Sequence, residues 1–167
     1  MPEGLKRYQQ SGHIHLITFS CDRRLPYLAV PQSRDTFEQV LEHVRVKHSF
    51  KIFAYVVMPE HVHLLLSEPP ETTLATVLKV LKQETSKRLK EGRDHFWMSR
   101  YHDFNVFTPD RVKQKIDYIH YNPLKRGLVE KPEDWPWSSF RHYATGMDGS
   151  VKIESYWTLI RNEQTVV

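Results

Sequence analysis

The chain has 167 residues, a formal net charge of +4 and a single cysteine. Its length fits one domain with a core of its own, and the lone Cys21 excludes a disulfide framework and a cysteine-rich zinc site. No apolar run is long enough to cross a bilayer or has the form of a secretory leader, so we expect a cytoplasmic protein without a membrane partner. Ten histidines, 12% aromatic residues and several Lys/Arg clusters favour a polyanionic partner.

The first predicted element is a strand over residues 13–19, where apolar and polar residues alternate. It contains a His-x-His pair, His13 and His15, which serves as an internal comparison for a second such pair downstream. Arg23 and Arg24 are predicted to end this strand.

A helix and a hairpin follow. Apolar residues at three- and four-residue steps predict an amphipathic helix over 31–48, and two apolar runs around a turn at 58–60 predict a β-hairpin over 51–68. Because side chains alternate along a strand, His61 and His63 share one face. The opposite face can pack on a core through Val62, Leu64 and Leu66. A bare His-x-His is more often a pair of ordinary hydrogen-bonded histidines than a metal site.

Three more elements complete the core. Residues 71–93 carry a helical apolar stripe, residues 101–107 alternate as a strand, and a helix is predicted from 109 until Pro123 stops it just beyond Asn122. A basic ridge of Lys79, Lys82 and Lys90 lies on another face of the first of these helices. Such a ridge is either a solvated face or a contact surface for a polyanion.

The order strand, helix, strand, strand, helix, strand is the split βαβ pattern of a ferredoxin-like α+β sandwich. We therefore predict a four-stranded antiparallel sheet with helices on one face and the other face open to a ligand, followed by a C-terminal helix and an aromatic tail. We expect one domain over 1–167, with its core at about 13–143 and a C-terminal tail at 144–167.

The last predicted helix carries a hydroxyl and an amide on one face. Tyr118 and Asn122 are four residues apart and therefore neighbours on the helix surface. Placed over the histidine pair, Asn122 would complete a three-ligand metal site, and Tyr118 would be positioned to attack a phosphodiester that the metal polarises. A tyrosine at such a position is, on its own, more often a packing residue.

Aromatic and basic residues also gather in the segment 131–143, which includes Trp137 and Arg141. Aromatic side chains near cations can stack on unpaired bases. They can equally pack the segment onto the domain.

Together these motifs resemble the single-tyrosine HUH transposases of the IS200-like class, especially their REP-associated relatives. The resemblance rests on Met58-Pro59-Glu60-His61-Val62-His63, Tyr118-Ile119-His120-Tyr121-Asn122-Pro123, Lys125-Arg126-Gly127-Leu128-Val129 and Asp134-Trp135-Pro136-Trp137-Ser138. It covers the chain from about His13 to Tyr143. It implies that His61, His63 and Asn122 bind a divalent ion and that Tyr118 forms a 5′-phosphotyrosine link with single-stranded DNA.

The resemblance implies an enzyme that nicks and rejoins single-stranded DNA beside a hairpin. Its partner would be single-stranded or hairpin DNA, and its cofactor would be Mg²⁺ or Mn²⁺. We would expect it in the bacterial cytoplasm, associated with the nucleoid when it is bound to DNA. Relatives of this kind act as monomers or homodimers. The residues that we expect to contact DNA are Arg23, Arg24, Lys79, Lys82, Lys90, Lys125, Arg126, Trp137 and Arg141.

Other interpretations of the sequence remain open at this point. One is a domesticated transposase that binds a nucleic-acid hairpin without cleaving it. Another is a metalloenzyme that acts on small phosphodiesters. The residues alone also do not separate DNA from RNA, and imidazole ligands accept manganese, cobalt or zinc as well as the magnesium that an amide oxygen and a phosphate favour.

Overall fold

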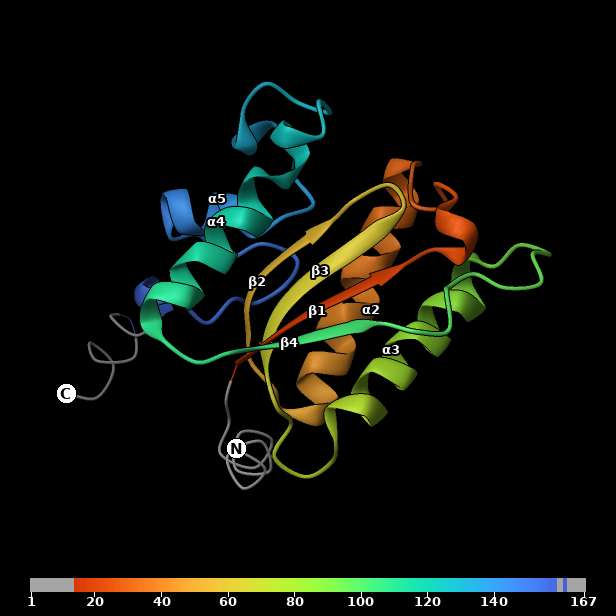
Figure 1. The fold of residues 1–167 in the computed structure, drawn as a ribbon, viewed down its shortest axis with the longest axis horizontal. Helices are drawn as coiled ribbons and strands as arrows, with labels where there is room; N and C mark the ends of the chain where they lie inside the picture. Colours follow the sequence, from red (N-terminus) through yellow and green to blue (C-terminus); the bar gives the residue numbers. More distant parts are fainter. Residues whose placement is uncertain (1–13, 159–160, 162–167) are drawn as a thin grey trace.

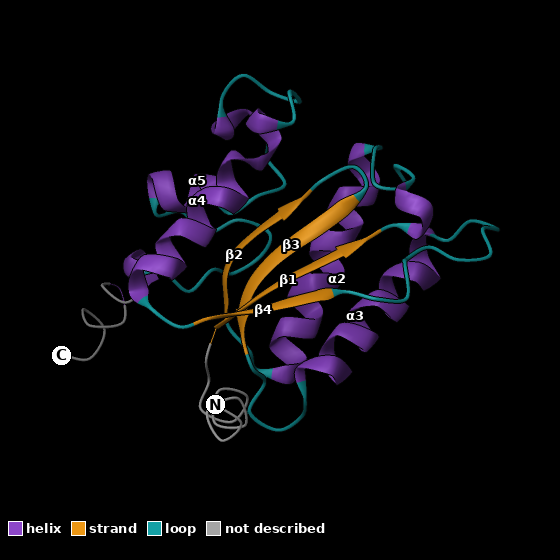
Figure 2. Ribbon diagram, in the orientation of Figure 1, coloured by secondary structure: helices purple, strands orange, loops and turns teal. Residues whose placement is uncertain are grey.

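The computed structural model describes residues 14–158 and 161, so His13 lies outside the described residues. Figures 1 and 2 show a four-stranded sheet with α2 and α3 side by side behind it. The elements are β1 Ile14–Ser20, η1 Asp22–Arg24, α2 Pro31–His48, β2 Ile52–Val57, β3 His61–Ser67, α3 Leu74–Leu89, β4 His102–Val106, α4 Pro109–Lys125, η2 Pro132–Asp134 and α5 Phe140–Thr145. Within the described part of the chain, no helix combines the length and the apolar character that a bilayer span requires.

The sheet has the strand order β2-β3-β1-β4, and every neighbouring pair is antiparallel. This is the strand order of the split βαβ sandwich, so the predicted fold class is confirmed. The register places Thr18 of β1 opposite His63 of β3 and, on its other side, opposite His102 of β4. Three strands thus bring one polar residue each to the same level of the sheet.

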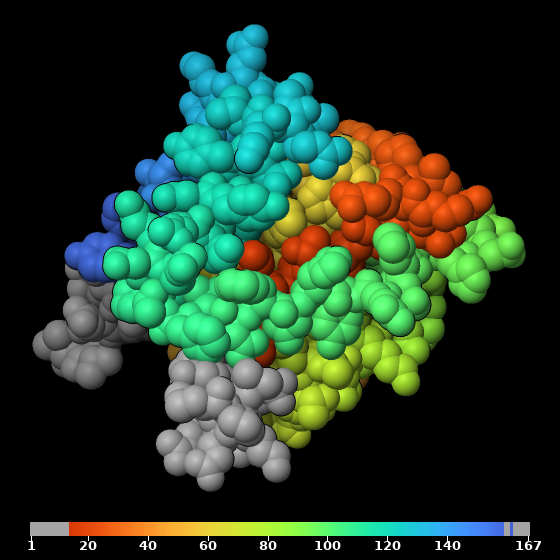
Figure 3. All heavy atoms as spheres, in the orientation of Figure 1, coloured from red at the N-terminus to blue at the C-terminus, as the bar shows by residue number. Residues whose placement is uncertain are grey.

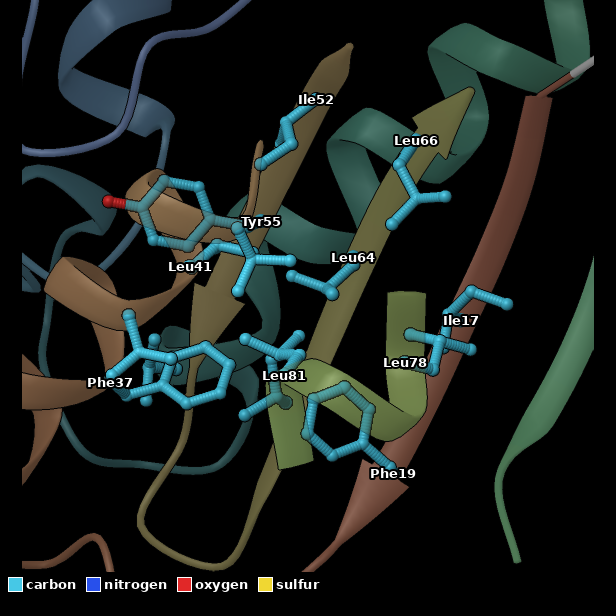
Figure 4. Close-up of a cluster of buried hydrophobic side chains, with 14 of the residues drawn as sticks. Ile17, Phe19, Phe37, Leu41, Ile52, Tyr55, Leu64, Leu66, Leu78 and Leu81 are labelled. Carbon is cyan, nitrogen blue, oxygen red and sulfur yellow. The ribbon is translucent and has the colours of Figure 1, made fainter. Parts of the chain in front are cut away.

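The larger core lies between the sheet and the helices α2 and α3. Alternate residues of β1 and β3 point into it, among them Ile17, Phe19 and Leu64, and they pack against Phe37 of α2 and Leu81 of α3 (Figure 4). Val62 and Leu66 join the same cluster, as the alternation of β3 predicts. Cys21 is also buried there as a small apolar residue.

The opposite face of the sheet is partly covered by α4, which packs against β2. A second apolar cluster forms there, with Val56 and Leu65 from the sheet, Ile119 from α4 and Trp135 from the following segment. The prediction of an open face is therefore correct only beside β1 and β4. In Figure 3, red atoms of β1 remain visible between the blue-green atoms of α4 and the green atoms of β4.

The helix α4 continues through Pro123, contrary to the predicted stop. Proline removes only its own N–H, and the turn beyond it is closed by Arg126, whose N–H donates to the carbonyl of Asn122. The helix ends before Gly127, which adopts a φ of +74°. Two other boundaries also differ: α3 spans Leu74–Leu89 because Thr73 caps its first turn, and β1 ends at Ser20.

Between β1 and α2 the chain turns through two consecutive residues in the left-handed region. Arg23 has a φ of 52° and Arg24 a φ of 56°, so the predicted strand end at these arginines is a strained turn. Each non-glycine residue in this region costs about 1 kcal/mol or more. The turn directs Arg24 towards the cavity described next.

Candidate active site

The histidine pair of β3 faces α4 and is almost entirely buried. His61 is 4% exposed and His63 is 5% exposed. Their Nε2 atoms lie 3.1 Å apart, and their rings meet edge to face. The strand therefore presents two imidazole nitrogens at one point, as its alternation predicted.

Each ring is fixed through its other nitrogen. The Nδ1 atom of His63 is 2.7 Å from the Thr18 hydroxyl, and the Nδ1 atom of His61 is 2.9 Å from the Glu60 carboxylate. A guanidinium nitrogen of Arg126 contacts the same Glu60 oxygen at 2.7 Å. With Nδ1–H donating to Glu60 and to Thr18, both Nε2 atoms carry a free lone pair.

Burial favours the neutral form of both rings. It lowers the pKa of His63 to about 3, with further contributions from His61 and Arg24. It also lowers the pKa of His61, although Glu60 opposes the effect. Burial raises the pKa of Glu60, but His61 and Arg126 together outweigh it, and the net shift is downward. At neutral pH the site therefore holds two neutral imidazoles beside an ionised carboxylate.

The helix α4 adds the predicted amide and hydroxyl. The Nδ2 atom of Asn122 is 3.5 Å from the Nε2 atom of His63, while its Oδ1 atom is buried without a hydrogen-bond partner. The Tyr118 ring stands edge-on to the His63 ring, with centroids 5.3 Å apart, and is 45% exposed. Tyr121 is similarly exposed but does not line this cavity.

These side chains line a cavity of about 760 Å³ that opens beside β1 and β4. Four cations border it, namely Arg24, Arg100, Lys125 and Arg126, and among the described residues no carboxylate lines it. Thr18 and His102 add further polar groups. The cavity is therefore positive and lined by donors, which suits a phosphate group.

The donor set fits a divalent ion. Two neutral imidazole nitrogens converge, and the orphaned amide oxygen of Asn122 reaches the same point after a half-turn of the amide. In the described part of the chain, no three His, Cys, Asp or Glu side chains converge on a metal site. A three-ligand site at His61 and His63 therefore needs the Asn122 amide, the ligand that the sequence predicted.

The predicted DNA contacts divide into two groups. Arg24, Lys125 and Arg126 line the cavity. Lys79 on α3 and Lys90 at the C-terminal cap of this helix are exposed, and α3 packs on the opposite face of the sheet. The Lys82 ammonium donates to the Met98 carbonyl at 2.7 Å. The remaining three also lie outside the cavity: Arg23 pairs with Asp22, Trp137 stacks on Arg34, and Arg141 donates to the Glu133 carbonyl. The role of all nine in DNA binding stays a prediction.

His15 of the comparison pair has a different environment. It is 1% exposed, on the face of β1 towards α2 and α3, and its two nitrogens lie 2.7 Å from Asp103 and 2.8 Å from Glu68. Since both partners are carboxylates, the ring donates a hydrogen bond from each nitrogen. His15 therefore forms structural ion pairs with Asp103 and Glu68. Replacing His15 would therefore remove structural contacts, and its companion His13 lies outside the described residues.

The sequence did not indicate four residues of the site as functional: Thr18, Glu60, Arg100 and His102. Glu60 directly precedes the histidine pair, so its position was a usable signal. Thr18 and His102 reach the site only through the register of β1 with β3 and β4. Arg100 lies in the loop before β4 and carried no periodic signal.

Known proteins are similar to this chain in sequence and in fold. A family model described as "Transposase IS200 like" matches residues 8–122. A REP-associated tyrosine transposase of Escherichia coli is 28% identical over 148 residues, which cover 85% of this chain and 86% of that protein. A Haemophilus influenzae protein classed with the REP-associated tyrosine transposases is 31% identical over 134 residues, covering 71% and 74%.

Among solved structures, a REP-associated tyrosine transposase bound to a REP hairpin superimposes with a TM-score of 0.70. Its sequence is 24% identical, and the match covers 86% of this chain and 87% of that one. The fold agrees with the split βαβ sandwich found here, and the family model extends to Asn122 at the cavity. The chain belongs to the IS200-like transposase family, and its relatives include REP-associated tyrosine transposases.

Proposed function

We propose that this protein nicks and rejoins single-stranded DNA beside a hairpin, with Tyr118 as the nucleophile and a divalent metal ion as cofactor. One observation carries the proposal: Tyr118 and the orphaned Asn122 amide meet the paired Nε2 atoms of His61 and His63 in one cavity. The cavity is bordered by cations, as a phosphodiester substrate requires.

His61, His63 and Asn122 would hold the ion, which we expect to be Mg²⁺ or Mn²⁺. When bound, the ion supplies positive charge that offsets the extra negative charge of the phosphorus in the transition state. The chain's own part is to orient the ligands. Thr18 and Glu60 hold the two rings so that both Nε2 lone pairs point at the ion.

Tyr118 performs the bond exchange. Its phenol oxygen attacks the phosphorus, the phenol proton passes to solvent at this exposed position, and the bond from phosphorus to the 3′ oxygen breaks. The departing 3′ oxygen takes up a proton and becomes a hydroxyl, while the 5′ phosphate stays on Tyr118. Attack by a 3′ hydroxyl on this phosphotyrosine reverses the step and joins the strand.

Cations around the cavity orient the substrate. Arg24, Arg100 and Lys125 face the space beside the histidines and would bind the phosphates on either side of the scissile one. Hairpin DNA is the favoured substrate because the structural relative was determined with a REP hairpin. The protein would work as a monomer or as a homodimer.

The proposal is tested by incubating the full chain with labelled hairpin DNA that carries single-stranded flanks, with Mg²⁺ and with EDTA. A covalent protein–DNA adduct on a denaturing gel, formed only with the metal, supports it. Specific binding without any cleavage or adduct would instead establish a hairpin-binding protein. Cleavage of small phosphodiesters but not of oligonucleotides would indicate the metalloenzyme for small phosphodiesters that the sequence also left open.

A further inference from the structure

An exposed aromatic residue lies beside the cavity on the edge strand β4. Phe104 is 53% exposed and lies opposite Leu16 of β1, so it faces the side of the sheet on which His63 and α4 lie. His102, two residues earlier on the same face, already lines the cavity. An exposed aromatic ring at this position offers a stacking surface next to the cavity.

The helix α4 faces this strand with a basic stripe. Arg111, Lys115, Tyr118, Asn122 and Lys125 recur at three- and four-residue steps, so they lie along one side of the helix. Three side-chain contacts orient the stripe towards β4 and β3. The Lys115 ammonium is 4.8 Å from the Phe104 ring centroid, and Tyr118 and Asn122 both contact His63.

The stripe is uniformly cationic apart from its two site residues. The fourteen steps from Arg111 to Lys125 correspond to roughly 21 Å along the helix. The only carboxylate of β4, Asp103, points to the other face of the sheet, where it binds His15. Asp110 and Asp117 of α4 fall outside the stripe by helical geometry. The trough between α4 and β4 is therefore positive, and Figure 3 shows β1 as its floor.

We propose that the single-stranded DNA next to the scissile phosphate runs along this trough, with one base stacked on Phe104 and the adjacent phosphate bound by Lys115. This inference rests on the proposed function, because it deepens the description of the same substrate. Aromatic rings with neighbouring cations bind single strands in this way, and the stacking is tolerant of base identity. A base held on Phe104 would fix the position of the next phosphodiester relative to Tyr118 and the histidine pair.

The first test measures binding of two DNAs in EDTA, so that no cleavage occurs. One is a hairpin with single-stranded flanks on both sides, and the other is the same hairpin without flanks. Phe104→Ala should weaken binding of the flanked hairpin roughly 5- to 150-fold and leave the unflanked one unchanged. Phe104→Trp keeps a stacking surface and should bind the flanked DNA as tightly as the wild type. Because Phe104 is half exposed, both variants should fold, which a thermal melt checks.

Lys115 has a matched control on the same helix. Lys113 is exposed and lies on the far side of α4, so Lys113→Ala and Lys115→Ala make the same change in helix propensity. Lys115→Ala should reduce the salt dependence of flanked-hairpin binding by about one ion, whereas Lys113→Ala should leave it unchanged. Photocrosslinking of 5-iodouracil placed in the flanks should label the peptide that contains Phe104.

The outcomes separate this inference from the proposed function. If Phe104→Ala weakens binding of both hairpins equally, or of neither, the stacking site is wrong even when the wild type forms its adduct. If the flank-specific loss occurs but the wild type forms no adduct, the trough binds single strands and the nuclease proposal is wrong. If the wild type binds both hairpins with equal affinity, the proposal that the trough binds the single-stranded flank is also wrong.

Discussion

The Nε2 atoms of His61 and His63 face each other at 3.1 Å, while the Nδ1 atom of His61 contacts the Glu60 carboxylate and that of His63 contacts the Thr18 hydroxyl. With both Nδ1 atoms protonated, the two neutral rings direct their Nε2 lone pairs at one point, which is unfavourable unless a proton or a cation lies between them. Burial lowers the pKa of both rings and so disfavours the proton. This arrangement supports the proposal that the pair binds a metal ion, and the first prediction tests it.

Replacing His61 and His63 by Ala should abolish adduct formation with Mg²⁺. The loss should exceed the roughly 10- to 100-fold effect that removal of an outer-shell partner has at metal sites. Hairpin binding, measured by fluorescence anisotropy, should stay close to wild type because its contacts go mainly to phosphates outside the pair. The control is His43→Ala, since His43 is exposed on α2. Full activity of the double variant would remove the histidines from the mechanism.

The loss of activity on replacing Asn122 should depend on whether the new side chain carries an oxygen donor. Asn122→Asp keeps an oxygen donor and should retain part of the activity, with a changed preference between Mg²⁺ and Mn²⁺. Asn122→Leu has nearly the same size but no donor, so adduct formation should fall much further. Metal titrations of adduct yield compare the two variants. Equal activities would show that the orphaned amide has another purpose.

Thr18 is expected to act by orienting His63. Thr18→Val keeps the branched shape in β1 but removes the hydroxyl that holds Nδ1 of His63 at 2.7 Å. Loss of such a partner should raise the metal concentration needed for half-maximal activity roughly 10- to 100-fold, and saturating metal should restore much of the rate. A lower rate that metal does not restore would contradict this positioning role.

His15 should make stability depend on pH. Burial lowers its pKa, but the hydrogen bonds and charges of Asp103 and Glu68 outweigh burial and raise the pKa above 6.5. The folded state therefore binds the proton more tightly than the unfolded chain does. The resulting stabilisation is complete below pH 6.5 and is lost as the pH rises through the folded pKa. Each pKa unit corresponds to about 1.4 kcal/mol.

The measurement is the free energy of unfolding of the wild type minus that of His15→Gln, from about pH 6 to about pH 9. This difference should shrink as the pH rises. His43→Gln, at an exposed site, is the control for the substitution itself. A difference that stays constant over this range would mean that the ring is held neutral between the two carboxylates.

The position of His61 and His63 on one face of the strand was predictable because strand alternation is a local property of the chain. The same holds for Tyr118 and Asn122, whose shared helix face follows from their spacing. Their approach to His63 depends on where α4 packs, which Ile119 and Trp135 decide by burying Leu65 and Val56. No local pattern encodes that docking, so only the family resemblance indicated it.

Register explains the residues that were missed. Thr18 becomes a partner of His63 only because β1 pairs with β3 at one particular offset, and a shift of one residue would turn it to the other face. The left-handed turn at Arg23 and Arg24 was equally hidden, since arginine rarely adopts that conformation and carries no turn signal. Pro123 was misjudged for the opposite reason, because a strong local signal was overridden by the surrounding helix.

The nucleophile is the most direct test of the proposed chemistry. Tyr118→Phe removes one oxygen that makes no hydrogen bond within the described residues, so the free energy of unfolding should change by less than about 0.5 kcal/mol. Hairpin binding should also persist, while adduct formation and strand cleavage should stop. The wild-type adduct, digested with protease and analysed by mass spectrometry, should place the nucleotide on the peptide that contains Tyr118.

Tyr121 provides the matched control for that experiment. It is 49% exposed on the same helix, three residues further on, but it does not line the cavity that Tyr118 and Asn122 line. Tyr121→Phe should therefore form the adduct at the wild-type rate. An adduct mapped to Tyr121 would require α4 to rotate relative to β3 in the DNA complex. Full cleavage by the Tyr118→Phe protein would leave the cavity with water as its attacking group, because no other tyrosine lines it among the described residues.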